Sequence, residues 1–305
     1  MNNEKKQITL IDGGMGQELL KRSGAKPTPL WSAQILLDQP DIVRELHADF
    51  IKAGARVITL NAYSVTPERL ERDGKLSDFE HLQKRAVDVA VAAREKVGQS
   101  DVSIAGCLPP LVASYRPEEA PEYQVMLDTY RRIVDQQKNH VDLFICETMS
   151  SVFEAEAAVT AARESGLPTW VALSVADDDS GLLRNGQPLA DAIARMDELG
   201  ASAKLLNCSK PEAISASWKT LASGQGAIGA YANGFTSISA LEPGGTVDTL
   251  SARHDLGPEN YANFVMQWIE QGADIVGGCC EVGPEHIAVI AQRLSAAGYT
   301  NRWVN

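Results

Sequence analysis

Three cysteines lie at the ends of two short apolar runs. Cys279 and Cys280 are adjacent and follow a glycine pair in ADIVGGCCEVGPEHI, and Cys208 ends the run AKLLNCSK. Adjacent cysteines bond to each other only with strained geometry, whereas both sulfurs can bind one small ion where glycines let the backbone turn sharply. Three thiolates bind tetrahedral zinc and leave one position vacant, as in catalytic zinc sites. The pattern therefore predicts a zinc site made by Cys208, Cys279 and Cys280.

The other two cysteines have an ordinary interpretation. Cys107 in SIAGCLPP and Cys146 in LFICETM continue apolar runs, and free cysteine is among the most buried residue types. We interpret both as core residues. A second enzyme hypothesis makes one cysteine a nucleophile with a histidine as base. It is disfavoured because the nearest histidine to the cysteine pair, His286, lies on a predicted helix and none neighbours Cys208 in the sequence.

Eight short apolar runs alternate with amphipathic segments along the chain. The predicted strands are 8–14, 56–63, 102–109, 143–149, 169–175, 203–209, 227–233 and 274–280. The predicted helices are 40–55, 78–98, 151–166, 188–200 and 260–273, and several end in glycine, which is typical of a helix C-terminus. This alternation predicts an α/β fold, a single (β/α)8 TIM barrel that spans residues 1–305. The alternative is a doubly wound open sheet.

A barrel gathers the carboxyl ends of its strands around one mouth, where such enzymes have their active sites. Polar residues and thiols stand at these ends: Asp12, Asn61, Tyr63, Glu147, Asn207, Cys208, Asn233, Cys279 and Cys280. An open sheet would bring them together less easily. The barrel and the predicted metal site therefore support each other.

The segment IDGGMGQELL has the features of an amino-acid site. Backbone N–H groups of Gly13 and Gly14, just before a helix, can bind a carboxylate. Asp12 ahead of them can bind an ammonium group, and Glu147 at the end of the fourth strand is a second candidate for that group. The segment matches neither the dinucleotide-binding glycine motif nor the P-loop, so a nucleotide is not indicated.

Two aromatic residues suggest a second ligand. Trp31 in PLWSAQ and Tyr63 just after the second strand present ring faces that attract a cationic methyl group, as in quaternary ammonium or sulfonium compounds. We therefore expect a small cationic ligand near the predicted zinc.

Composition excludes several other classes of protein. The chain has 305 residues, 44% of them hydrophobic, with 40 acidic and 28 basic residues and a net charge of −12. No basic cluster is present, so we expect no nucleic acid partner. The sequence has no signal-peptide pattern and no run long enough to span a membrane. We expect a soluble, cytoplasmic protein, since five cysteines fit a reducing compartment where thiols stay available to a metal.

The motifs together resemble those of the zinc-dependent homocysteine S-methyltransferases, which use S-methylmethionine or betaine as methyl donor. The resemblance covers most of the chain: DGGMGQEL, LWSA, PDIVRELHADFIKAGARVITLNAY, ICET, LLNCS and GGCCEVGPEHI. It implies that Cys208, Cys279 and Cys280 bind zinc and that a homocysteine-binding barrel places the substrate on Asp12, Glu147, Gly13 and Gly14. It also implies that Trp31 and Tyr63 contact the methyl donor and that the product is methionine.

The choice of donor depends on where the chain departs from the family pattern. The third-strand exit, GCLPPLVASYRPEE, differs from the segment typical of S-methylmethionine enzymes, and Thr148 stands where betaine enzymes have an aromatic residue. The chain also ends soon after the barrel, without the long arm of the tetrameric betaine enzymes. We expect S-methylmethionine to be the preferred methyl donor and betaine the second choice. We also expect the protein to be a monomer or a small homo-oligomer. The alternative from another functional class is a binding protein: a barrel that binds zinc or a small amino acid and catalyses no reaction.

Overall fold

The strands of this protein form a ring. The computed structural model describes residues 6–303, and its strands are β1 (Gln7–Leu10), β2 (Val57–Thr59), β3 (Ser103–Leu108), β4 (Leu143–Met149), β5 (Thr169–Leu173), β6 (Ala203–Asn207), β7 (Ala227–Tyr231), β8 (Ile275–Val276) and β9 (Thr300–Asn301). They follow the order β2-β3-β4-β5-β6-β7-β8-β1-β9, with parallel pairing throughout. A parallel bridge between Ile11 and Val57 joins the end of β1 to β2. The ring is therefore closed, which confirms the barrel and excludes the open sheet.

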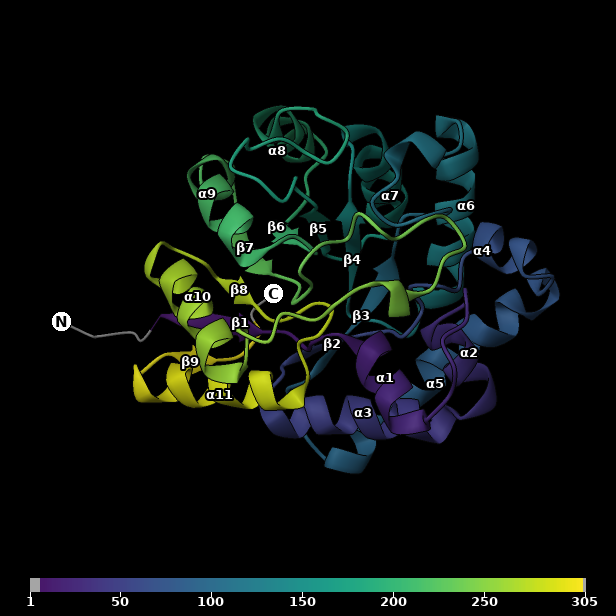
Figure 1. The fold of residues 1–305 in the computed structure, drawn as a ribbon, viewed down its shortest axis with the longest axis horizontal. Helices are drawn as coiled ribbons and strands as arrows, with labels where there is room; N and C mark the ends of the chain where they lie inside the picture. Colours follow the sequence, from purple (N-terminus) through teal and green to yellow (C-terminus); the bar gives the residue numbers. More distant parts are fainter. Residues whose placement is uncertain (1–5, 304–305) are drawn as a thin grey trace.

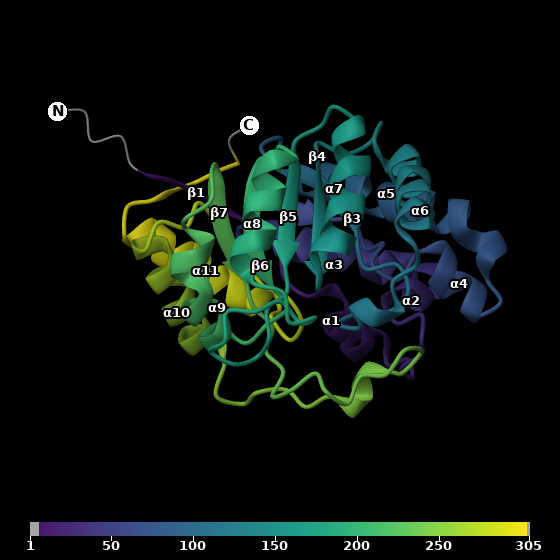
Figure 2. The same ribbon diagram turned by 90° about the horizontal axis from the view of Figure 1, so that it is seen from above.

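Helices surround this ring in both views (Figure 1, Figure 2). They are α1 (Met15–Ser23), α2 (Ser32–Asp38), α3 (Pro40–Ala53), α4 (Pro67–Arg72), α5 (Phe79–Val97), α6 (Tyr123–Gln137), α7 (Val152–Glu164), α8 (Leu189–Glu198), α9 (Pro211–Leu221), α10 (Pro258–Glu270) and α11 (Pro284–Ala296), with short 3-10 turns η1 (Leu76–Asp78), η2 (Pro117–Glu119) and η3 (Val247–Thr249). The five predicted helices correspond to α3, α5, α7, α8 and α10. Their boundaries follow local chemistry: α3 begins with Pro40 in its first turn and ends at Gly54, whose φ of 118° few other residues adopt.

The eight predicted strands are all present, but most of them end before the predicted residue. The predicted strand 274–280, for example, is only Ile275–Val276 in the structure. The remaining residues of that run leave the ladder and turn at the mouth of the barrel. Most of the residues expected to do chemistry are thus held in turns that follow the strands, whereas Glu147 lies within β4. The added strand β9, next to β1, was not predicted.

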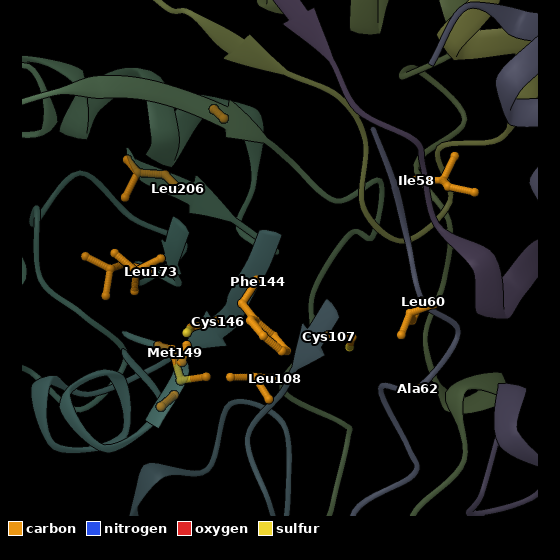
Figure 3. Packing of buried hydrophobic residues seen from close by; sticks show 14 of the residues in the cluster. Ile58, Leu60, Ala62, Cys107, Leu108, Phe144, Cys146, Met149, Leu173 and Leu206 are labelled. Carbon is orange, nitrogen blue, oxygen red and sulfur yellow. The ribbon is translucent and has the colours of Figure 1, made fainter. Parts of the chain in front are cut away.

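Alternation along the strands separates two apolar layers. Leu143 and Ile145 of β4 lie in the cluster inside the ring, whereas Phe144 and Cys146 belong to the larger cluster between sheet and helices. Figure 3 shows Phe144, Cys146 and Cys107 among the apolar side chains of that larger cluster. Both cysteines are buried, with exposed fractions of at most 1%, which confirms them as core residues.

A long segment, residues 232–257, connects β7 to α10 and crosses the mouth of the barrel. In Figure 1 it runs in green across the front of the ring toward α4, and Figure 2 shows it beyond one end of the strands. Glu242 in this segment pairs with Arg116 at 2.7 Å, and Gly244 lies against the side chain of Arg72 in α4. The segment therefore contributes one wall of the cavity at the mouth. No helix within residues 6–303 is long and apolar enough to cross a membrane.

Candidate active site

The structure brings the three predicted zinc ligands together. Cys208 follows β6, Cys279 and Cys280 follow β8, and their sulfur atoms all lie within 4.8 Å of one another. Cys208 and Cys279 are joined as a disulfide with a Cα–Cα distance of 5.9 Å, and Cys280 is a buried free thiol. Zinc–sulfur bonds of about 2.3 Å place the sulfurs of a tetrahedral site roughly 3.8 Å apart. The three sulfurs therefore fit one zinc ion once the disulfide is reduced.

The backbone at this mouth adopts conformations that side chains rarely allow. Within residues 6–303, five residues other than glycine have φ between +48° and +64°: Trp31, Tyr115, Thr148, Cys208 and Glu281. Each is a predicted site residue, follows one directly, or packs against the cysteine cluster. Such conformations persist only where the surroundings fix them, and they concentrate at functional sites. The strain therefore marks the same mouth as the cysteines do.

Asn207 connects two of these strained positions, Thr148 near the end of β4 and Cys208 just after β6. Its side-chain oxygen accepts from the Thr148 N–H at 3.1 Å, and its amide nitrogen donates to the Thr148 hydroxyl at 3.0 Å. All of these groups are buried. Because Asn207 precedes Cys208 and Thr148 follows Glu147, one side chain fixes the exits of β6 and β4 relative to each other. Thr148 is thus directed at Asn207 and does not line the cavity.

The glycines after β1 have a packing role besides the predicted one. A Cβ atom on Gly14 would lie 2.4 Å from the Cys279 carbonyl oxygen, and the Gly14 N–H donates to the Val282 carbonyl at 2.9 Å. That N–H is therefore already used within the protein. The Gly13 N–H has no partner among the described residues, so it is the amide that remains for a ligand carboxylate.

The two predicted acids face the same cavity from β1 and β4. Asp12 accepts from the Thr59 N–H at 2.8 Å, and burial raises its pKa to about 8, with the nearby charge of Glu147 adding to the shift. Glu147 accepts from the Cys107 thiol at 3.0 Å, and burial raises its pKa to about 7. Two desolvated acids at one site favour a cationic ligand, because its charge would stabilise their ionised forms.

The predicted aromatic residues also line this cavity. The rings of Trp31 and Tyr63 meet edge to face, with their centroids 6.1 Å apart. The Trp31 indole N–H donates to Gln17 at 3.2 Å, and the Gln17 amide donates to Glu281 at 2.9 Å, next to the cysteine pair. A Cβ on Gly16 would lie 2.0 Å from the indole ring, so this position needs glycine. The ring of Trp31 is thereby fixed close to the cysteine turn.

Tyr231 and Arg69 are two of the cavity residues that were not predicted as site residues from the sequence. Tyr231, the last residue of β7, is 4% exposed, and its hydroxyl is buried without a hydrogen-bond partner among residues 6–303. Arg69 in α4 is 7% exposed and also lines the cavity. The alternation of β7 could have indicated Tyr231, because it lies two residues after the inward-facing Gly229. No sequence signal distinguishes Arg69 from an ordinary helix surface residue.

Comparisons with known proteins agree with this geometry. Residues 9–294 match the family model described as Homocysteine S-methyltransferase. Homocysteine S-methyltransferase 4 of Zea mays is 28% identical over 95% of this chain and 90% of its own length. The homocysteine S-methyltransferase of Escherichia coli (strain K12) is 26% identical over 95% of this chain and 96% of its own.

A solved structure shows the same fold. The homocysteine methyltransferase MmuM from Escherichia coli, in a metallated form, matches with a TM-score of 0.79 and 26% identity, over 95% of this chain and 97% of that one. Its oxidized form gives the same values. The predicted barrel, family and enzyme class are therefore confirmed, and the roles of individual site residues stay predictions. This chain belongs to the homocysteine S-methyltransferase family, the methyltransferases of class EC 2.1.1 that act on homocysteine.

Proposed function

We propose that this chain, as one homocysteine-binding barrel over residues 1–305, transfers a methyl group from S-methylmethionine to homocysteine and forms methionine. The observation that carries the proposal is the convergence at one mouth of three sulfurs, two buried acids and a pair of aromatic rings. Each group meets one requirement of the reaction. The three sulfurs would hold the metal that activates the nucleophilic sulfur, the acids would bind the amino acid, and the rings would bind the cationic methyl group.

We infer that the metal is zinc and that Cys208, Cys279 and Cys280 hold it. The set of three thiolates supports this choice, because soft sulfur ligands favour zinc in a tetrahedral site with one open position. When bound, zinc would take the homocysteine sulfur as its fourth ligand and keep it ionised at neutral pH. The Cys208–Cys279 disulfide must be reduced first, which suits the reducing cytoplasm. The metallated and oxidized forms of the E. coli relative are consistent with these two states.

The protein's own groups would orient the amino acid. Asp12 and Glu147 would bind the homocysteine ammonium, whose charge compensates the cost of ionising two buried acids. The free N–H of Gly13 and the unpartnered hydroxyl of Tyr231 would donate hydrogen bonds to the substrate. Holding the sulfur and the methyl group in line then supplies much of the rate.

Trp31 and Tyr63 would bind the cationic end of the donor. A cation on such ring faces gains about 0.5–2 kcal/mol, depending on desolvation, which is enough to prefer a cation over a neutral methyl compound. The donor then leaves as a neutral sulfide, so the attraction ends with the reaction. Betaine satisfies the same rings, and only a direct comparison of donors distinguishes it from S-methylmethionine.

A donor panel tests this proposal. Reduced, zinc-loaded protein is incubated with homocysteine and either S-methylmethionine or betaine, and methionine is measured. We expect the highest kcat/KM with S-methylmethionine, and Trp31→Ala should lower kcat/KM for the donor while the KM for homocysteine changes little. The proposed donor is wrong if betaine is the better substrate. The proposed activity is wrong if neither compound yields methionine.

A further inference from the structure

Arg69 is a buried cation without an acidic partner. Its Nη2 donates to the Pro110 carbonyl at 3.0 Å and to the Ser114 hydroxyl at 3.4 Å, whereas its buried Nε has no hydrogen-bond partner among the described residues. No carboxylate among the side chains that the structure describes, a set that leaves out Asp248, forms an ion pair with it. The adjacent acid, Glu68, accepts instead from the Thr129 hydroxyl at 3.1 Å.

This arrangement is costly for the free protein. A guanidinium group keeps its charge at all ordinary pH values, and a charge removed from water without a counter-ion lowers stability. Two oxygen acceptors on one nitrogen, together with the contact between the guanidinium and the Tyr63 ring face, offset only part of that cost. Arg69 also lies in the wall of a cavity, where a ligand can reach it. An unpaired buried cation in a cavity wall indicates an anionic ligand group.

The position of Arg69 relates it to one substrate. Its guanidinium carbon lies 5.4 Å from the centre of the Tyr63 ring, and the Tyr63 ring lies 6.1 Å from that of Trp31. Trp31 in turn packs against the cysteine cluster. Contacts therefore link the sulfurs to Trp31, Trp31 to Tyr63, and Tyr63 to Arg69, and all of these groups line the same cavity. A small molecule whose cationic methyl lies at the rings can reach Arg69 with its other end.

We propose that Arg69 binds the carboxylate of the methyl donor. The inference rests on the proposed function, and it restricts the donor to compounds that carry both a cationic methyl group and a carboxylate. The planar guanidinium suits this role, because it forms directed, charge-assisted hydrogen bonds with carboxylate oxygens. In the proposed function, Asp12, Glu147 and the Gly13 amide already bind the polar groups of homocysteine, the methyl acceptor.

The test compares two ligands that differ only in this group. Titration calorimetry on the reduced, zinc-loaded protein measures the Kd of S-methylmethionine and of its carboxamide, which keeps the sulfonium and ammonium but lacks the carboxylate. We expect the wild-type protein to prefer the carboxylate by about 10- to 100-fold, as typical for a hydrogen-bonded charge. Arg69→Gln should lose this preference and leave homocysteine affinity unchanged.

Arg85→Gln is the matched control. Arg85 also donates to a backbone carbonyl, that of Leu37 at 2.8 Å, and forms no ion pair within the described residues, but it lies outside the cavity. It should keep the wild-type preference. Arg69→Lys preserves the charge without the planar group, so its preference for the carboxylate should fall between those of the wild type and Arg69→Gln. It replaces Arg69→Gln in the test if that variant does not fold.

Two results would overturn the inference: a wild-type protein that binds the carboxamide as tightly as the acid, or an Arg69→Gln variant that weakens both ligands equally. A carboxylate preference that depends on Arg69 would support it even if the methyl-transfer assay yields no methionine. In that case the proposed activity fails while the binding site stands.

Discussion

Glu147 and Asp12 are acids whose ionisation is opposed by burial. For Glu147 the pKa rises from 4.5 to about 7, and for Asp12 it rises from 3.8 to about 8. In the free protein the neutral form is therefore favoured below about pH 8 for Asp12 and below about pH 7 for Glu147. A bound ammonium group reverses this preference, because it stabilises the carboxylates. The site thus has a pH dependence that substitution can reveal.

Glu147→Gln should change how stability depends on pH. The stabilising contribution of neutral Glu147 is complete below about pH 4.5, and it is lost as the pH rises through about 7. The glutamine side chain at position 147 of the variant stays uncharged at every pH. Its Tm in the metal-free protein should equal that of the wild type near pH 5 and exceed it at pH 8, by on the order of a few °C.

Thermal unfolding at the two pH values measures this difference. Glu122→Gln, at an exposed position, is the control and should shift the Tm little at either pH. A Tm difference for Glu147→Gln that is the same at pH 5 and pH 8 would refute the assigned ionisation.

Tyr231→Phe should separate binding from stability. Its hydroxyl forms no hydrogen bond with the described residues, so removing it deletes none and should leave the Tm unchanged or slightly higher. The KM for homocysteine should rise roughly tenfold, since one substrate hydrogen bond is lost. Tyr130→Phe provides the contrast, because the Tyr130 hydroxyl donates to Pro109 at 2.9 Å and its loss should lower the Tm. An unchanged homocysteine KM would exclude Tyr231 from the substrate site.

At the scale of elements, the turns that follow the strands decide the geometry of the site. The sequence predicted which residues stand at the strand ends, because apolar runs and helical periodicity mark where each strand begins and ends. It could not predict the positive φ of Thr148 and Cys208, since these conformations depend on a contact between distant segments. Asn207 supplies that contact, and an asparagine after an apolar run gives no indication of its partner.

Asn207→Ala should weaken both the fold and the metal site. It removes two buried hydrogen bonds to Thr148, which we expect to cost about 2–3 kcal/mol of unfolding free energy. Zinc affinity should also fall, although Asn207 is not a proposed ligand, because the turn at Cys208 loses its support. Chemical denaturation and competition with a chelator measure the two effects. Asn260→Ala, at an exposed asparagine with one hydrogen bond, is the control. Full zinc affinity in the Asn207 variant would contradict the positioning role.

At the scale of the whole molecule, closure of the barrel makes the site possible. Cys208 and the cysteine pair come from β6 and β8, which flank β7, and the acids come from β1 and β4. The alternation of strands and helices was enough to predict this architecture. The segment that crosses the mouth, residues 232–257, was not predicted to line the cavity, and neither was Arg69 in α4. Both depend on how loops fold over the mouth, for which apolar periodicity gives no signal.

The most direct test of the account is the zinc content of reduced protein with each cysteine replaced in turn by alanine. Elemental analysis should give one zinc per chain for the wild type and almost none for Cys208→Ala, Cys279→Ala and Cys280→Ala. Cys107→Ala and Cys146→Ala are matched controls from the core and should retain the metal. Full zinc in any of the first three variants, or its loss from a folded control, would contradict a site made by Cys208, Cys279 and Cys280.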